Sequence, residues 1–455
     1  MHTTVRLAFV AVLLTATVGA AAPSPDPVAG LTADRAAALV AEGGRPLSEE
    51  EILAATRLGL SGQPPAEASI LAVPDVKELT PRAAAALGRY RGAVLALDGL
   101  DDLSAETAAA LAEFSHEDGV LDLGGDVPHL HPWFGFLSLG GLRTIRPEAA
   151  AALAACTMNL LLDDLTTLSP DVATALAAHR GVLSLEGVRT MSGAAATALA
   201  KHRGEHLVLD GLTTLSPEAA AALARYEGAR LSLNGLEKLS PATARALAAY
   251  EGALRLQGLK SLSPDVAEAL AASTGTRLSL SGLTTLPAET AAALAEYLGE
   301  KLILNGLVEI SDEAAAALAG CAAKLDLQNM TTMSDAARAS LAKHVSANDD
   351  AVQKTYVICA PRLTGDMLPL MNVVATRQEE VILANITALD GEDAVAAARL
   401  LAAVDGRVCL PRLKRVSSEA YKTLRQAPNV VLPATEAITV GDDAHGTGAP
   451  HPETP

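Results

Sequence analysis

One unit of 23 or 24 residues recurs through most of this chain and constrains its fold more than any other feature. A representative copy, residues 231–252, reads LSLNGLEKLSPATARALAAYEG. Leu231 and Leu233 are two residues apart, so on a strand they face the same side. Ser240 and Pro241 then mark a helix start, because serine is a preferred N-cap and proline suits the first helical position. Each copy therefore predicts one strand followed by one short helix.

Glycine occupies two fixed places in the unit. The first follows the strand, at Gly235 and at Gly99, Gly141, Gly187, Gly211, Gly258, Gly282 and Gly306, with Asp164, Asn329 or Asn385 in other copies. Glycine, asparagine and aspartate tolerate a left-handed backbone, so this position predicts a positive φ. The second place, such as Gly252, lies beyond the helix. There the glycine is typical of a left-handed helix stop.

Neither the strand nor the helix of one unit can bury its apolar side alone, so consecutive units must stack. We predict an α/β repeat solenoid of about fifteen units, with a parallel β-sheet on one face and short helices on the other. The LxL strand, the turn residue and the helix resemble the leucine-rich repeat, from roughly Leu71 to Val431. The chain has Gly-Leu where that family usually has Asn or Cys. The resemblance implies a protein-interaction module.

The segments outside the regular repeats divide the rest of the chain. Residues 1–22 contain an apolar run followed by small residues, which predicts a signal peptide and a secreted, periplasmic or cell-envelope protein. This run is too short to span a membrane. We expect a linker over 23–30, a helical N-terminal cap over 31–66, the solenoid over 67–435 and a disordered tail over 436–455. Residues 126–136 and 345–355 interrupt the repeat.

The first interruption contains the only tryptophan, Trp133, next to Phe134. Too few residues separate the strands near Leu121 and Phe136 for a helix to fit between them. One interpretation is that the aromatic side chains replace the missing helix and fill the core. The other is an exposed contact patch, since aromatic residues are favoured anchors of interfaces.

Composition and motifs argue against several function classes. The net charge of −18 disfavours a nucleic acid or an anionic membrane as the partner. We find no catalytic motif, metal-ligand spacing or cofactor fingerprint, and therefore expect no catalytic residue, no metal and no cofactor. His179 and His202 follow repeat helices, where a cation suits the negative end of the helix dipole.

The residue before the turn glycine forms a ladder of polar side chains on the outer side of the predicted sheet. Its members are Asp98, Asp163, Glu186, Asp210, Asn234, Gln257, Ser281, Asn305 and Gln328. The acidic part of the ladder is either a solvated face or a ligand surface, where neighbouring carboxylates could share a cation. The candidate binding residues are Asp163, Glu186, Asp210, Asn234, Gln257, Trp133 and Phe134.

These features favour a non-enzymatic protein–protein interaction or scaffold module. One alternative is a structural protein that binds carbohydrate or cell wall. Another is an enzyme on a parallel β-helix that acts on polysaccharides through the acidic ladder. A β-helix would lack the helix that each serine-proline start predicts, so the presence of those helices decides between the two folds.

Overall fold

The computed structural model describes residues 31–43, 45–46, 69–114, 120–121, 129–130, 135–327, 329–330, 332–341, 343–344, 380–383, 386–389, 394–404, 406–410, 412–433 and 437–441. The chain divides into two compact units, which are described separately. The first comprises 1–259 with 273–278, and the second comprises 260–272 with 279–455. The predicted signal peptide, the linker, the second interruption, Trp133 and Phe134 lie outside the described residues.

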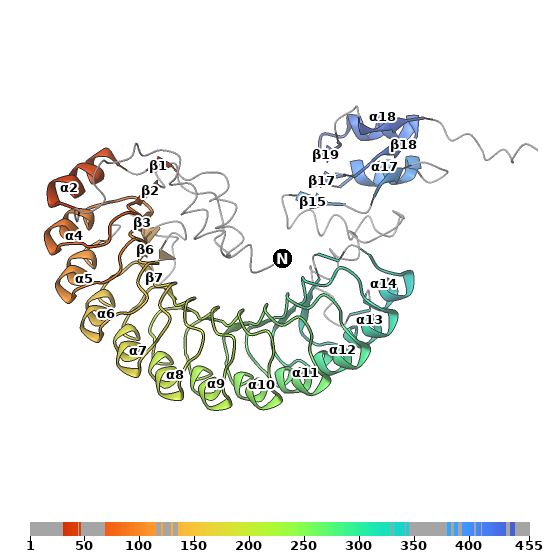
Figure 1. Cartoon of the computed structure of the whole chain (residues 1–455). Coiled ribbons are helices and arrows are strands. Elements are labelled where there is room, and N and C mark those ends of the chain that lie inside the picture. The colour runs from red at the N-terminus through yellow and green to blue at the C-terminus, as the bar shows by residue number, and fades with distance from the viewer. Residues whose placement is uncertain are drawn as a thin grey trace, which may run out of the picture. The chain divides into compact units, whose positions relative to one another are not determined.

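In the first unit, one helix and one strand alternate along the chain from α6 (Pro147–Leu153) onward (Figure 1). The strands, in sheet order, are β1 (Arg45–Pro46), β2 (Ser69–Ala72), β3 (Val94–Ala96), β6 (Phe136–Ser138), β7 (Asn159–Leu161), β8 (Leu183–Ser184), β9 (His206–Val208), β10 (Arg230–Ser232) and β11 (Ala253–Arg255). The helices are α2 (Ala33–Glu42), α4 (Pro81–Leu87), α5 (Ala105–Leu111), α6 (Pro147–Leu153), α7 (Pro170–Leu176), α8 (Gly193–Leu199), α9 (Pro217–Leu223) and α10 (Pro241–Leu247). Only the β1–β2 pair of this series is antiparallel.

The second unit continues the pattern with α11 (Pro264–Ala271), α12 (Ala288–Ala295), β13 (Lys301–Ile303), α13 (Asp312–Leu318), β14 (Lys324–Asp326) and α14 (Asp335–Leu341). β12 (Arg277–Ser279) contributes its first two residues to the first unit. Later come β15 (Glu380–Ile382), β16 (Ala388–Leu389), α17 (Ala394–Ala402), β17 (Arg407–Cys409), β18 (Arg415–Val416), α18 (Ser418–Gln426), β19 (Val430–Val431) and β20 (Thr439–Val440). Leu401, Val408 and Leu424 belong to a separate core there.

The register of the strands confirms the predicted solenoid of leucine-rich-repeat type. Leu231 of β10 lies opposite Leu207 of β9 and Leu254 of β11, in parallel pairing. These three leucines are at most 3% exposed, so the matching position of each repeat fills the same core. A helix follows each of these strands, which excludes the parallel β-helix. None of the described helices combines the length and the apolar character needed to cross a membrane.

The helices begin as predicted, but they end differently. Ser240 Oγ accepts a hydrogen bond from the Thr243 N–H at 3.1 Å, and Pro241 is the first helical residue. The Thr243 hydroxyl also donates to the Leu215 carbonyl of the preceding repeat, at 3.2 Å. α10 ends at Leu247, and its C-cap Ala248 keeps a right-handed conformation. The prediction of a left-handed glycine stop is therefore wrong.

The prediction of a positive φ at the turn glycine is also wrong. Among the described residues only Gly43 and Gly135 have positive φ, and no other residue type does, Asp164 and Asn329 included. The reason for the glycine is close packing. A Cβ on Gly235 would overlap the Asp210 carbonyl oxygen and would lie 2.7 Å from the Leu212 carbonyl oxygen. Glycine is needed here because the backbones of neighbouring repeats touch.

The first interruption of the repeat is bypassed by the sheet. The short strands β4 (Val120–Leu121) and β5 (His129–Leu130) pair with each other in antiparallel fashion. β3 pairs directly with β6, so the strand at Leu121 does not join the parallel sheet. The two interpretations of Trp133 and Phe134 remain predictions.

Candidate functional site

The outward side of the sheet in the first unit carries side chains that change from repeat to repeat. At the start of β3, β6, β7, β9, β10 and β11, paired positions hold Val94, Phe136, Asn159, His206, Arg230 and Ala253. The next residue of each strand points inward and is leucine in all six, at most 3% exposed. The inward position is thus constant, while the outward position varies widely in size and charge, from the buried Val94 to the partly exposed Arg230.

The polar ladder joins each repeat to the next one. Asp210 accepts hydrogen bonds from the Ser232 hydroxyl at 2.7 Å, the Asn234 backbone N–H at 2.8 Å and the Asn234 side-chain amide at 3.0 Å. Asn234 Oδ1 in turn accepts from the Gln257 N–H at 2.9 Å. Ladder residues therefore satisfy backbone donors at the strand exit of the following repeat.

The same contacts recur in the acidic part of the ladder. Asp98 accepts from the Ser138 hydroxyl at 2.6 Å and from the Gly140 N–H at 2.8 Å. Asp163 accepts from the Ser184 hydroxyl at 2.5 Å and from the Glu186 N–H at 3.4 Å. The structure thus places Asp163, Glu186, Asp210, Asn234 and Gln257 on neighbouring repeats. Several of their polar atoms form hydrogen bonds that connect one repeat to the next.

Burial, more than repulsion by neighbouring carboxylates, sets the pKa of Asp163. The pKa of the Asp163 carboxyl is raised to about 6, chiefly by burial and to a smaller extent by the charges of Asp98 and Asp164. The hydrogen bonds from Ser184 and Glu186 act in the opposite direction. In the part of the chain that the structure describes, no three His, Cys, Asp or Glu side chains are arranged to hold a metal ion.

A group of basic residues occupies the outward side near the acidic ladder. It consists of His206, Arg230, Arg255 and Arg277, here called the cationic strip. Burial and the charges of Arg230 and Arg255 lower the pKa of His206 to about 4. Burial and the charge of Arg277 lower the pKa of Arg230. Sequence reasoning missed this group, although comparison of outward positions across repeats would have revealed it.

Aromatic and imidazole rings stack in the turns that follow the helices. Ring centroids lie 6.0 Å apart for His179 and His202, 5.9 Å for His202 and Tyr226, and 6.1 Å for Tyr226 and Tyr250. The Tyr226 hydroxyl donates to the Gly204 carbonyl at 2.7 Å. This ring column replaces the predicted cations at helix ends. His179 and His202 are at most 4% exposed, and burial lowers both pKa values, that of His202 to about 4.

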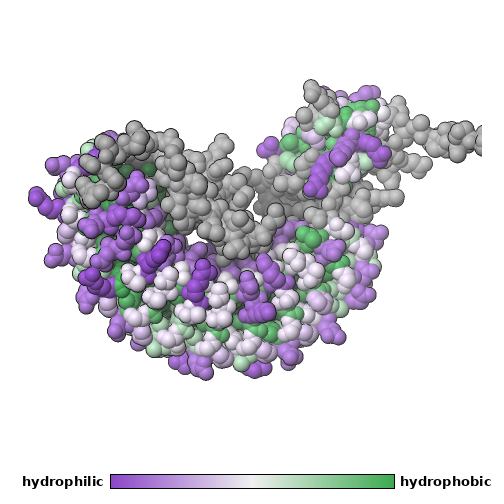
Figure 2. Space-filling model, viewed as in Figure 1, coloured by the Kyte–Doolittle hydropathy of each residue, from purple (hydrophilic) through white to green (hydrophobic). Residues whose placement is uncertain are grey.

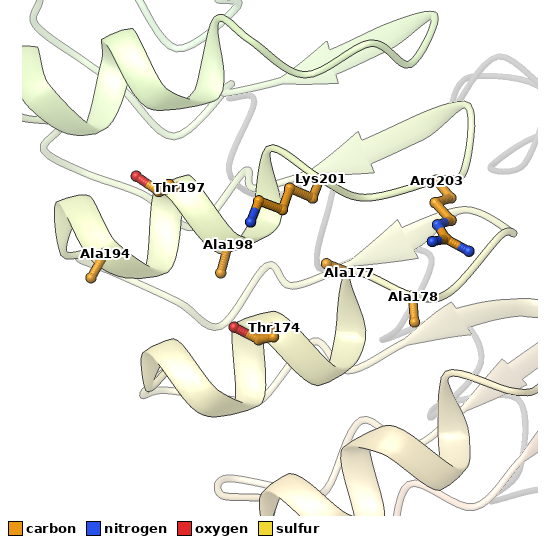
Figure 3. Close-up of a pocket in the computed structure, with 8 residues that line it drawn as sticks. All are labelled: Thr174, Ala177, Ala178, Ala194, Thr197, Ala198, Lys201 and Arg203. Carbon is orange, nitrogen blue, oxygen red and sulfur yellow. The ribbon is translucent and has the colours of Figure 1, made fainter.

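A depression of about 360 Å³ lies between α7 and α8 (Figure 3). It is lined by Thr174, Ala177, Ala178, Ala194, Thr197, Ala198, Lys201 and Arg203. The Thr174 and Thr197 hydroxyls donate to carbonyls of their own helices, each at 2.8 Å. Hydrophilic and hydrophobic residues are interspersed on the face seen in Figure 2. The depression therefore offers small side chains and two basic groups without a convergent set of polar atoms.

No family model and no curated protein matches this chain. Among solved structures, a leucine-rich repeat protein of Leptospira interrogans is similar with 14% identity and a TM-score of 0.27, over 67% of this chain and 92% of that one. Toll from the Drosophila Toll–Spätzle complex is similar with 13% identity and a TM-score of 0.41, over 75% of this chain and 46% of that one. An internalin of Listeria monocytogenes is similar with 13% identity and a TM-score of 0.31, over 68% of this chain and 92% of that one. Because these identities and TM-scores are low, the fold assignment rests on the sequence repeat and the strand register described above.

Proposed function

We propose that this protein is a non-enzymatic scaffold that binds another protein through the outward side of its sheet. The observation that carries the proposal is the contrast between constant inward leucines and variable outward side chains. Packing explains the constant positions and also Phe136, which contacts the apolar cluster around Val94, but it does not explain why Asn159, His206 and Arg230 replace one another at a single register position. A rigid frame that presents variable side chains is suited to recognition.

The hydrogen bonds of the polar ladder support the proposal that the outward side of the sheet binds a partner. Asp163 and Asp210 accept hydrogen bonds from the following repeat, so their carboxylates help to hold the strands in register. A surface held in this way loses little conformational freedom when a partner docks, which favours affinity. Asp163, Glu186, Asp210, Asn234 and Gln257 remain proposed contact residues at the edge of that surface. Trp133 and Phe134 remain proposed contacts as well.

We also propose that the protein works outside the cytoplasm, as a secreted or cell-envelope protein. The support is the apolar run and the small residues within positions 1–22. A protein partner in that compartment fits the acidic net charge, which disfavours nucleic acids and anionic membranes.

Site-specific photocrosslinking of the full chain tests the scaffold proposal. A benzophenone amino acid is placed at Ala253, on the outward side of β11, or at Ala242, exposed on α10 of the preceding repeat. We expect one discrete crosslinked protein from the native extract with Ala253 and none with Ala242. Equal yields at the two positions, or no product at Ala253, would contradict binding through the sheet.

A further inference from the structure

The cationic strip is unusual in a chain whose net charge is −18. Arg230 lies opposite His206 on one side and Ala253 on the other, and Arg255 lies opposite Ser232. Arg277 begins β12, the strand after β11 in the sheet order. All four side chains therefore project from the same side of neighbouring strands, because the residues that follow His206, Arg230 and Arg277 are buried leucines.

The strip has a regular spacing. Arg230 and Arg277 start strands that are two steps apart in the sheet, so their Cα atoms are about 10 Å apart. Arg255 lies one strand away from Arg230 and two residues further along, at about 8 Å. His206, Arg230 and Arg255 are partly buried, and Arg277 is exposed. Partial burial strengthens electrostatic attraction to a ligand that reaches them.

The strip residues act on one another electrostatically. The charges of Arg230 and Arg255 disfavour protonation of His206, and the charge of Arg277 disfavours protonation of Arg230. Repulsion among the strip residues costs folding free energy, and an anionic ligand would remove that cost.

We propose that the cationic strip binds an extended, glutamate- or aspartate-rich segment of a partner protein. Guanidinium groups bind carboxylates through paired hydrogen bonds, and arginine is favoured at partly desolvated interfaces. In an extended segment of polyproline II conformation, residues three apart project from the same side at about 9 Å, which is close to the spacing of Arg230 and Arg277. Glu186 on the acidic side of the sheet would repel the same segment and so fix its position. This inference rests on the proposed scaffold function and names the chemistry of its partner.

The test uses the full chain and a fluorescein-labelled peptide with glutamate at every third residue, followed by fluorescence anisotropy. Arg230→Ala/Arg277→Ala removes two strip charges, and alanine already occupies the equivalent register position as Ala253. The matched control, Arg225→Ala/Arg245→Ala, removes two exposed arginines after α9 and on α10. We expect the strip variant to lose about tenfold or more in affinity, equivalent to about 1.4 kcal/mol. The control should bind like the wild-type protein.

Three results would overturn the inference. They are equal losses in the two double variants, equal binding of a peptide with glutamine in place of glutamate, and stronger binding of tripolyphosphate or a single-stranded oligonucleotide than of the peptide. Thermal melts by circular dichroism establish that both variants fold. If the peptide does not bind but the photocrosslink at Ala253 is still obtained, the acidic-segment inference is refuted and the scaffold proposal stands. Loss of the Ala253 crosslink together with retained peptide binding would refute the scaffold proposal.

Discussion

Gly235 lies against the backbone of the preceding repeat, where a single methyl group would meet the Asp210 carbonyl oxygen. The equivalent glycines Gly211 and Gly258 face carbonyl oxygens of their own preceding repeats in the same way. At the residue scale, the repeat is therefore limited by the distance between backbones. The identity of the turn residue reflects how closely two units approach each other, since its φ lies in the range that any residue adopts.

Substitution at Gly235 separates close packing from backbone handedness. We expect Gly235→Ala and Gly235→Asn each to lower the free energy of unfolding by about 1–3 kcal/mol, because both add a Cβ to a filled space. Urea unfolding measures both. Gly320→Ala is the control, since its Cβ would meet no atom closer than 3.7 Å. An asparagine variant as stable as the wild-type protein would restore the left-handed interpretation.

His202 makes stability depend on pH. Burial lowers its folded pKa to about 4, while the unfolded value is about 6.5. The unfolded chain therefore binds a proton first as pH falls, and the contribution of the neutral ring is lost between about pH 6.5 and 4. His179 and Tyr226 stack on either side of the ring. His202→Phe should remove up to about 3 kcal/mol of this acid sensitivity.

Urea unfolding of both proteins at pH 7 and pH 4.5 measures that difference. Asp163 acts in the opposite direction, because its folded pKa is raised to about 6 and its protonated form is favoured by folding. The Asp163 contribution is common to the wild-type protein and His202→Phe, so it cancels in the comparison. Parallel pH profiles of the unfolding free energy for the two proteins would show that folding does not lower the pKa of His202.

At the scale of helices and strands, each helix start is a local structure that recurs with little change. Ser216, Ser240 and Ser311 each accept a hydrogen bond from the N–H three residues later. α6 and α12 begin without such a bond, at Arg146 and Pro287. The solenoid thus tolerates an uncapped helix where the packing of the neighbouring units is sufficient.

Ser240→Ala should lower the free energy of unfolding by about 1 kcal/mol, because the N–H of Thr243 loses its acceptor. Ser240→Asp should preserve most of the stability, since aspartate is an equally good N-cap. Thermal and urea unfolding of the two variants test this. A larger loss with aspartate than with alanine would contradict the capping role of Ser240.

Local signals were sufficient to predict these elements from the sequence. Leucines two residues apart and serine-proline pairs depend on neighbours within one unit, so the solenoid and the helix starts were predicted correctly. The reason for the turn glycine, the burial of His179 and the pairing of β4 with β5 depend on contacts between segments distant in sequence. The cationic strip likewise becomes visible only when Arg230 and Arg277 are placed on parallel strands in register.

At the scale of the whole molecule, export remains a prediction from residues 1–22. A signal peptidase cuts after small residues, so mature protein from its native source should begin between Ala20 and Pro23. Intact-mass and N-terminal peptide mass spectrometry measure this directly. Mature material that retains Met1 would contradict the prediction and, with it, the proposed extracellular location.

Two kinds of side-chain hydrogen bond connect neighbouring repeats, and in both the donor belongs to the later repeat. Asp98, Asp163 and Asp210 each accept from a serine and a backbone N–H of the following repeat, while the Tyr226 hydroxyl reaches back to Gly204 of the preceding one. Several junctions therefore share the same kinds of connector. Where two junctions share these connectors, in-frame duplication or deletion of the 23- or 24-residue unit between them would join matching surfaces, so the architecture allows its length to change in single genetic steps.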